Sequence, residues 1–134
     1  MGLMEIIAGL LTQAGLKYQQ DGNSLTLLWK TDHFDDLIVR IISSDDGRWV
    51  YIVAPFPSIK ELSAEDQAEL AFSMLRESWK MNGVKLALDP NDNIVVMAET
   101  NDTDLTPSEI EMLVRNVVFA CDRLWEIHRE AVMS

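Results

Sequence analysis

Three apolar segments joined by short turns constrain the fold of this chain more than any other feature. They are "SLTLLWK" (24–30), "LIVRII" (37–42) and "RWVYIVAP" (48–55), and they are rich in the β-branched and aromatic residues that favour strands. The turn "SSDDG" (43–47) separates the last two, and a short extended piece around 17–20 ends at "DGN" before the first. A parallel pair needs a crossover of about a dozen residues or more, so connections this short predict an antiparallel sheet.

Three helices are predicted beside these strands. Apolar residues at helical spacing open the chain and end at Gly15, and a second helix begins near Ser63 and ends at Gly83. The third begins at "LTPSEI", where Thr106 and Glu109 form a capping box, and continues to about residue 131. We expect the inner face of the second helix to consist of Leu70, Ala71, Met74, Leu75 and Ser78. We expect the stripe of the third to consist of Ile110, Leu113, Val114, Val117, Val118, Cys121, Leu124 and Trp125.

The stretch "VKLALDPNDNIVVMAET" raises the question of a calcium loop. In an EF-hand loop starting at Asp89, position six must be Gly and position twelve should be Glu, but the chain has Ile94 and Thr100 there. Asp89 followed by Pro90 fits the first two positions of a type I turn. We therefore predict a β-hairpin.

The predicted order of elements is α-β-β-β(-β)-α-β-β-α, where the bracketed strand is the short extended piece. This order predicts an α+β fold with a single antiparallel sheet and three helices. No linker divides the chain, so we expect a single domain over 1–134.

The charge and the cysteine content limit the possible partners and compartment. With 22 acidic and 11 basic residues the formal net charge is −11, which disfavours binding to nucleic acid or to an anionic membrane surface. Such acidity either attracts a cationic protein partner or only keeps a small protein in solution. The single cysteine, Cys121, allows no internal disulfide, and the N-terminus lacks the basic start of a signal peptide, so we expect a cytoplasmic protein.

Two groups of residues are candidates for chemistry. The segment "TDHFDDL" (31–37) carries Asp32, His33, Asp35 and Asp36, and one histidine with two carboxylates could bind a divalent metal. A catalytic zinc would need three protein ligands, and solvated loop charges are the simpler interpretation. Cys121 and His128 lie two helical turns apart, too far for a nucleophilic pair. We expect no catalytic residue, no cofactor and no metal, so the protein is predicted not to be an enzyme.

Apolar residues on both faces of the predicted sheet point instead to a binding surface. Leu28 opposes Leu25, Leu27 and Trp29, and Ile38 and Met97 likewise lie opposite the apolar faces of their own strands. Either helices cover both faces, or part of the surface is kept for a partner. Phe72 and Trp79 lie seven residues apart on one face of the second helix, outside its inner stripe, unless they are covered by the loop 55–62. The predicted interaction residues are Phe72, Trp79, Leu28, Ile38 and Met97.

The C-terminal half, "ESWKMNGVKLALDPNDNIVVMAETNDTDLTPSEIEMLVRNVVFACDRLWEIH" (77–128), resembles the type III secretion chaperone-like fold and the related YbjN-like family of bacterial sensory-transduction regulators. The passage "AGLKYQQDGNSLTLLWK" (14–30) is similar to the first helix-to-strand passage of that family. The resemblance implies a homodimer that binds extended protein segments or acts as a regulator without catalysis.

Two functions therefore follow as hypotheses. The first is a non-enzymatic protein-binding module, chaperone-like or regulatory, in which an acidic homodimer holds a segment of an unidentified protein partner. The second is a small metal-dependent protein or enzyme that uses the Asp32–Asp36 loop.

Overall fold

The described part of the chain, residues 2–102 and 104–133 with side chains to residue 130, forms three helices and one six-stranded sheet in a computed structural model. In chain order the elements are α1 (Leu3–Gln13), β1 (Gln19–Asp21), β2 (Ser24–Trp29), β3 (Leu37–Ser43), β4 (Val50–Ser58), α2 (Ala64–Ser78), β5 (Lys85–Leu88), β6 (Asn93–Thr100) and α3 (Pro107–Met133). The predicted α+β class and the predicted order of elements are confirmed, with the short extended piece as β1.

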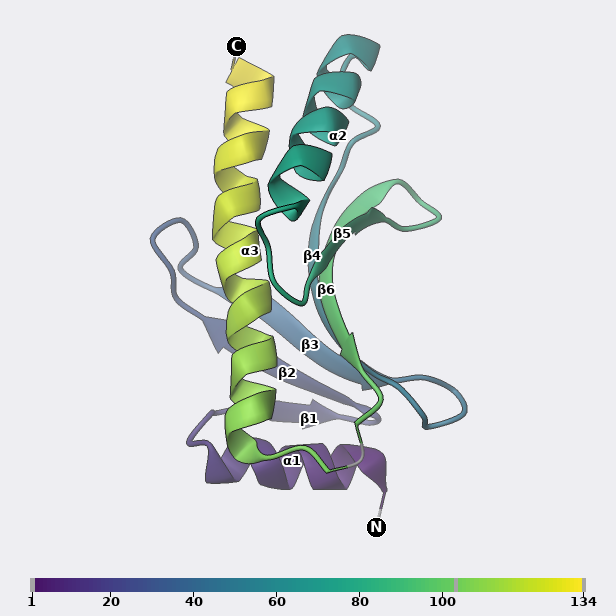
Figure 1. Ribbon diagram of the computed structural model, residues 1–134, viewed down its shortest axis with the longest axis vertical. Helices are drawn as coiled ribbons and strands as arrows, with labels where there is room; N and C mark the ends of the chain where they lie inside the picture. Colours follow the sequence, from purple (N-terminus) through teal and green to yellow (C-terminus); the bar gives the residue numbers. More distant parts are fainter. Residues whose placement is uncertain (1, 103, 134) are drawn as a thin grey trace.

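The sheet has the strand order β1-β2-β3-β4-β6-β5, and every neighbouring pair is antiparallel. β4 pairs with β6 although α2 and β5 lie between them in the sequence, so the hairpin of β5 and β6 extends the sheet beyond β4. This leaves β5 as an edge strand. Figure 1 shows β5 beside α2, the long α3 crossing the sheet, and the two termini at opposite ends of the molecule.

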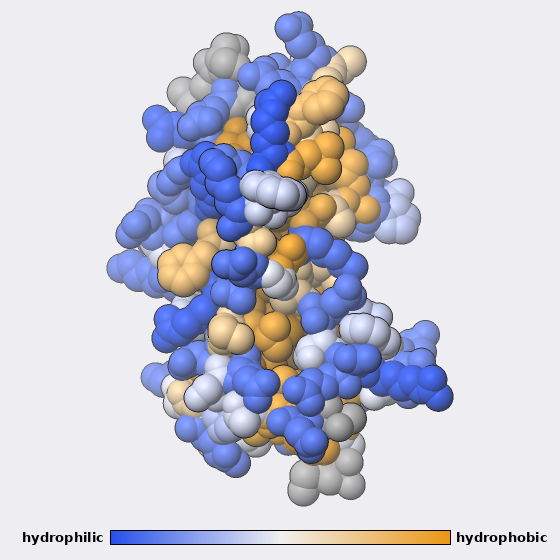
Figure 2. All heavy atoms as spheres, viewed as in Figure 1, coloured by the Kyte–Doolittle hydropathy of each residue, from blue (hydrophilic) through white to orange (hydrophobic). Residues whose placement is uncertain are grey.

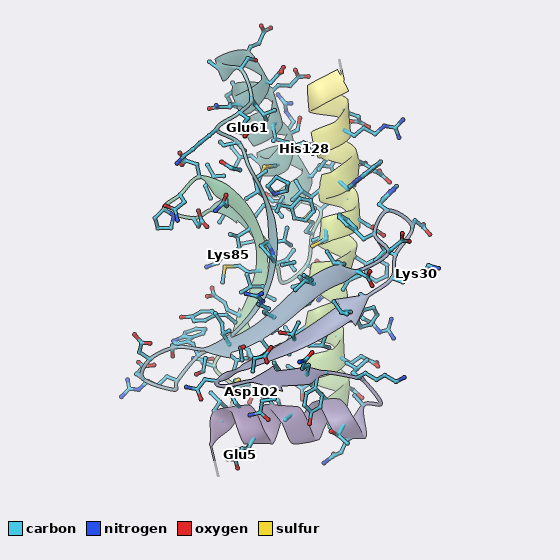
Figure 3. All side chains as sticks on the ribbon, turned by 180° about the vertical axis from the view of Figure 1, so that it is seen from behind. Glu5, Lys30, Glu61, Lys85, Asp102 and His128 are labelled. Carbon is cyan, nitrogen blue, oxygen red and sulfur yellow. The ribbon has the colours of Figure 1, made fainter. Side chains whose placement is uncertain are left out.

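All three helices contribute to one hydrophobic core on one face of the sheet. In β3 the burial alternates strictly: Leu37, Val39 and Ile41 are buried, whereas Ile38 and Ile42 are exposed. The buried side chains of β2, β4 and β6 follow the same alternation and join those of the helices in a single cluster. Seen from behind, the strands lie in front of α3, so the other face of the sheet carries no helix among the described residues (Figure 3). Helices therefore do not cover both faces of the sheet, and the alternative that part of this surface is kept for a partner stays a prediction.

β4 differs from its prediction because it continues through Pro55 and Pro57 instead of ending there. Its pairing with β3 reaches only to Val53, and beyond that residue it pairs with β6 alone. Proline lacks an N–H and is tolerated where one neighbour is missing or where the register is irregular. Both conditions hold here, since the register with β6 shifts between Pro55 and Ser58.

The predicted caps and the predicted hairpin turn are confirmed. The Thr106 N–H donates to Glu109 Oε1 at 3.1 Å and the Glu109 N–H donates to Thr106 Oγ1 at 3.2 Å, which is a complete capping box. In the turn between β5 and β6, the Asp89 carboxylate accepts from the backbone N–H of Asn91 at 2.8 Å and of Asn93 at 3.0 Å. Asp89 therefore closes a hairpin turn by local hydrogen bonds.

Candidate partner-binding surfaces

α2 is covered along a narrower stripe than the sequence predicts. Leu70 and Met74 are buried, but Ala71 is exposed and Leu75 is 68% exposed, so the prediction was wrong for the last two residues. The reason is that α2 packs against α3 and approaches the sheet only at the edge strand β5. A helix seated beside a neighbouring helix, and not flat on a sheet, buries only one row of its side chains.

The remaining side of α2 forms the first apolar surface, which we call the α2–β5 surface and define by Phe72, Leu75, Trp79 and Leu88. Trp79 is 91% exposed, and the other three are also exposed. A groove of about 220 Å³ separates α2 from β5, and Figure 2 shows apolar side chains gathered between these two elements. The lining residues are Ile59, Gln67, Leu70, Ala71, Met74, Leu75, Ser78, Leu86, Ala87 and Leu88. Phe72 is 58% and Trp79 91% exposed, so the loop 55–62 leaves both side chains largely uncovered, as the prediction that they lie outside the inner stripe requires.

The free face of the sheet forms the second apolar surface, the outer sheet face, defined by Leu28, Ile38, Ile42 and Met97. Leu28 is 63% exposed and lies directly opposite Ile38 in the β2–β3 register, so the two side chains are neighbours. Ile42 is exposed and Met97 is half-buried. Exposed aliphatic side chains side by side on a sheet form a patch that can be covered by a partner.

The charges beside the outer sheet face are mixed. Arg40 lies opposite Thr26 and Val53 in the register, and Lys85 Nζ is 3.2 Å from Glu99 Oε1 at the other side of the face. The net charge of −11 is therefore not reproduced on this surface, which bears basic side chains among its apolar ones.

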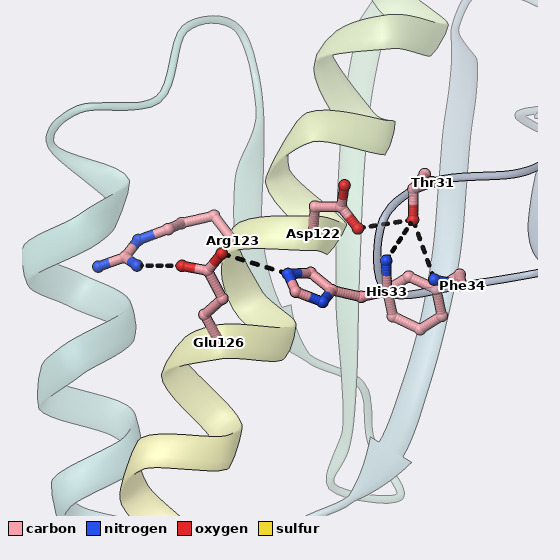
Figure 4. Close-up of polar contacts among 6 residues, drawn as sticks. All are labelled: Thr31, His33, Phe34, Asp122, Arg123 and Glu126. Atoms are coloured by element: carbon pink, nitrogen blue, oxygen red, sulfur yellow. Dashed lines mark hydrogen bonds and ion pairs between the residues drawn. The ribbon is translucent and has the colours of Figure 1, made fainter.

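The loop between β2 and β3, which the sequence offered as a metal site, is fastened to α3 (Figure 4). Thr31 Oγ1 donates to Asp122 Oδ1 at 2.6 Å and accepts from the backbone N–H groups of His33 and Phe34. The His33 ring stacks on Trp125 with a centroid distance of 4.2 Å. His33 is thus used to hold the loop in place.

A chain of side-chain contacts continues from this loop to α2. His33 Nε2 lies 3.2 Å from Glu126 Oε1, Glu126 Oε2 accepts from Arg123 at 2.7 Å, and Arg123 Nη2 donates to Glu77 of α2 at 2.7 Å. The hydrogen bonds from His33 and then Arg123 lower the pKa of Glu126, and Arg123 lowers the pKa of Glu77. The two carboxylates raise the pKa of Arg123. The network therefore ties the β2–β3 loop, α3 and α2 together through side-chain contacts.

The surroundings of the other candidate residues, which are the three aspartates of this loop and Cys121, fit a structural role. Asp32, Asp35 and Asp36 are exposed, and within the described residues no three His, Cys, Asp or Glu side chains are grouped to hold a metal ion. Cys121 is fully buried, and burial raises the pKa of its thiol to about 12, so the thiol stays protonated at neutral pH. In the part of the chain that is described, no helix has the length and apolarity needed to cross a bilayer.

Solved structures with the same fold include several proteins of low sequence identity. YbjN from E. coli matches with a TM-score of 0.68 at 16% identity, over 96% of this chain and 92% of that one. The ExsC–ExsE complex matches with a TM-score of 0.63 at 17% identity, over 96% of both chains. The type III secretion chaperone SycH from Yersinia pestis, solved with a fragment of YscM2, matches with a TM-score of 0.59 at 14% identity, over 90% of this chain and 98% of that one. Among curated proteins none matches.

A family model adds evidence from the sequence itself. The model of the Tir chaperone protein (CesT) family matches residues 5–124, from the first turn of α1 to about two thirds of the way along α3. The match includes both surfaces defined above and the loop fastened to α3. The resemblance to the type III secretion chaperone-like and YbjN-like proteins is confirmed, and this chain belongs to the Tir chaperone protein (CesT) family.

Proposed function

We propose that this chain is a non-enzymatic binding module, chaperone-like or regulatory, which works as an acidic homodimer and holds a segment of a partner protein. In this proposal the α2–β5 surface joins the two copies and the outer sheet face receives the partner segment. Membership of a chaperone family supports partner binding, as do similar structures that contain a protein partner, such as ExsC with ExsE and SycH with a fragment of YscM2.

The proposal is based mainly on the exposure of large apolar side chains on two separate surfaces, the α2–β5 surface and the outer sheet face. Trp79 at 91% and Leu75 at 68% leave most of their apolar area in water on α2. Fully burying such a side chain stabilises a structure by roughly 1.5–3 kcal/mol, and large aromatic residues are favoured anchors of interfaces. Because α2 and β5 are adjacent, a second copy could cover the helix and the edge strand together.

The outer sheet face suits an extended segment for a different reason. Leu28 and Ile38 form a neighbouring pair on adjacent strands, and a pleated surface presents such pairs at regular spacing. A segment with alternating apolar residues could therefore place side chains against several pairs in turn. Arg40 on the same face favours an acidic residue beside the apolar ones, whereas Lys85 is already paired with Glu99.

The partner hypothesis is tested by comparing two single variants as baits in a native lysate. Leu28→Asp places a charge on the outer sheet face, whereas Met112→Asp places the same charge on α3, at a residue that is 55% exposed against 63% for Leu28. We expect proteins retained by the wild type and by Met112→Asp to be lost from Leu28→Asp. Retention of the same proteins by all three baits would contradict the outer sheet face as the binding surface.

Elemental analysis of the purified protein distinguishes the binding module from the metal-dependent alternative. Our proposal predicts less than stoichiometric divalent metal, because His33 is already engaged by Trp125 and Glu126. One tightly bound divalent ion per chain, lost in an Asp35→Asn, Asp36→Asn variant, would favour the alternative.

A further inference from the structure

A second hollow, separate from both partner surfaces, lies where the β2–β3 loop meets the end of β4 and the C-terminal part of α3. Its volume is about 450 Å³, within the range of about 300–1,000 Å³ that is typical of small-molecule sites. We call it the aromatic pocket and define it by its lining residues, which are Phe34, Pro55, Phe56, Pro57, Trp125, His128 and Arg129.

Three segments distant in the sequence hold the walls of the aromatic pocket in place. Phe34 and Phe56 meet edge to face, with ring centroids 5.8 Å apart and an interplanar angle of 82°. The Trp125 ring is held by stacking on the His33 ring, with the two ring centroids 4.2 Å apart. The loop that carries Phe34 is fastened by the hydrogen bond of 2.6 Å from Thr31 to Asp122. A ligand entering this pocket would meet rings already arranged, which lowers the entropic cost of binding.

The charge at the rim of the aromatic pocket is opposite to that of the whole chain. None of the seven lining residues is acidic, although the chain has 22 acidic residues and only 11 basic ones. The Arg129 guanidinium carbon lies 5.6 Å from the centroid of the Trp125 ring, and the described residues give Arg129 no carboxylate partner. A guanidinium lying over an indole keeps its N–H donors available for an anion.

We propose that the aromatic pocket binds a small aromatic carboxylate. The ring of the ligand lies among Phe34, Phe56 and Trp125, where edge-to-face and offset contacts favour an aromatic group over an alkyl chain. The carboxylate is bound by Arg129, with His128 beside it at the rim. A neutral aromatic ligand makes the same ring contacts without the charge-assisted hydrogen bonds, so the site discriminates by charge.

Naphthoate and its neutral amide, naphthamide, test this proposal by isothermal titration on the full chain, with ¹⁵N and ¹³C NMR to locate the ligand. We expect naphthoate to bind about fivefold or more tightly than naphthamide, and Arg129→Gln to remove that difference. The matched control is Arg76→Gln, because Arg76 also lies over an aromatic ring, at 5.9 Å from Phe72, but on α2 outside the pocket. Arg76→Gln is expected to leave naphthoate binding unchanged.

Two results would overturn the proposal. One is naphthoate binding that Arg129→Gln and Arg76→Gln weaken equally, which would indicate attraction by surface cations in general. The other is the absence of NMR shifts at Phe34, Phe56 and Trp125 in the presence of naphthoate, which would exclude the pocket whatever the affinity. Neither result depends on the oligomeric state or on the outer sheet face, so this test is independent of the proposed function.

Discussion

At the scale of single residues, Glu77 connects α2 to α3 through one guanidinium. Arg123 Nη2 lies 2.7 Å from Glu77 Oε1 and lowers the pKa of this carboxyl below its ordinary value, which is about 4.3. A carboxyl with a lower pKa in the folded state contributes stability above its unfolded pKa and loses that contribution as the pH falls through the folded pKa. We therefore predict that Glu77→Gln lowers the free energy of unfolding at pH 7 and approaches the wild type below about pH 4.

Urea unfolding at a series of pH values measures this effect. Glu111→Gln is the control, since Glu111 forms a longer ion pair of 3.7 Å with Arg115 one turn away within α3. A surface pair of this kind contributes little, so the control is expected to follow the wild type at every pH. If Glu77→Gln also follows the wild type throughout, the contact with Arg123 does not stabilise the fold.

Asp92 is a second residue with a particular backbone requirement. Its φ is +60°, in the left-handed region that glycine adopts without a steric penalty. We predict that Asp92→Gly changes the free energy of unfolding by less than about 1 kcal/mol, in the stabilising direction if at all, whereas Asp92→Ala destabilises. Thermal unfolding with and without calcium is the measurement. A calcium-dependent rise in melting temperature that disappears in Asp92→Gly would show that the loop binds calcium after all.

At the scale of elements, the long helix α3 is the central support of the core. Leu124 is fully buried, whereas Leu113 is only half-buried at the edge of the stripe. Leu124→Ala should therefore destabilise by roughly 2–5 kcal/mol, because a cavity opens between α3 and the sheet, and Leu113→Ala by clearly less. Chemical denaturation of the two variants shows which of them loses more stability. Equal losses of unfolding free energy at the two positions would mean that the buried stripe of α3 is centred differently on the helix.

Local signals in the sequence were sufficient to predict most of the helices and strands. The start of α3 follows from Thr106 and Glu109 because a capping box depends only on residues three apart, and the hairpin after β5 follows from Asp89 for the same reason. The inner face of α2 could not be obtained in this way. Leu75 has the spacing of a buried residue, but it stays exposed because α2 packs mainly against α3 and meets the sheet at the edge strand β5.

At the scale of the whole molecule, the exposed aromatic pair Phe72 and Trp79 could be predicted from the sequence, whereas the aromatic pocket could not. The exposure of Phe72 and Trp79 was predictable, because residues seven apart share one face of a helix and this face lies outside the inner stripe. The aromatic pocket was not, since Phe34, Phe56 and Trp125 are brought together only by the packing of a loop, a strand and α3. The neighbouring Asp32–Asp36 segment suggested a metal instead, because its sequence gives no sign that His33 stacks on Trp125.

The proposed assembly predicts that the whole molecule is a homodimer joined through α2 and β5. A Phe72→Asp, Trp79→Glu variant adds two charges to the α2–β5 surface at residues that are 58% and 91% exposed, so it should remain folded and become a monomer. The control is Ile6→Asp, Met112→Glu, which adds two charges at exposed apolar residues of α1 and α3 and should remain a dimer.

Sedimentation velocity of the wild type at micromolar concentration, with circular dichroism to verify folding, measures directly whether the chain is a homodimer. We predict a dimer for the wild type and for the Ile6→Asp, Met112→Glu control, and a folded monomer for Phe72→Asp, Trp79→Glu. A wild type that sediments as a monomer would contradict the homodimer, and a folded Phe72→Asp, Trp79→Glu variant that stays dimeric would show that the two copies meet elsewhere.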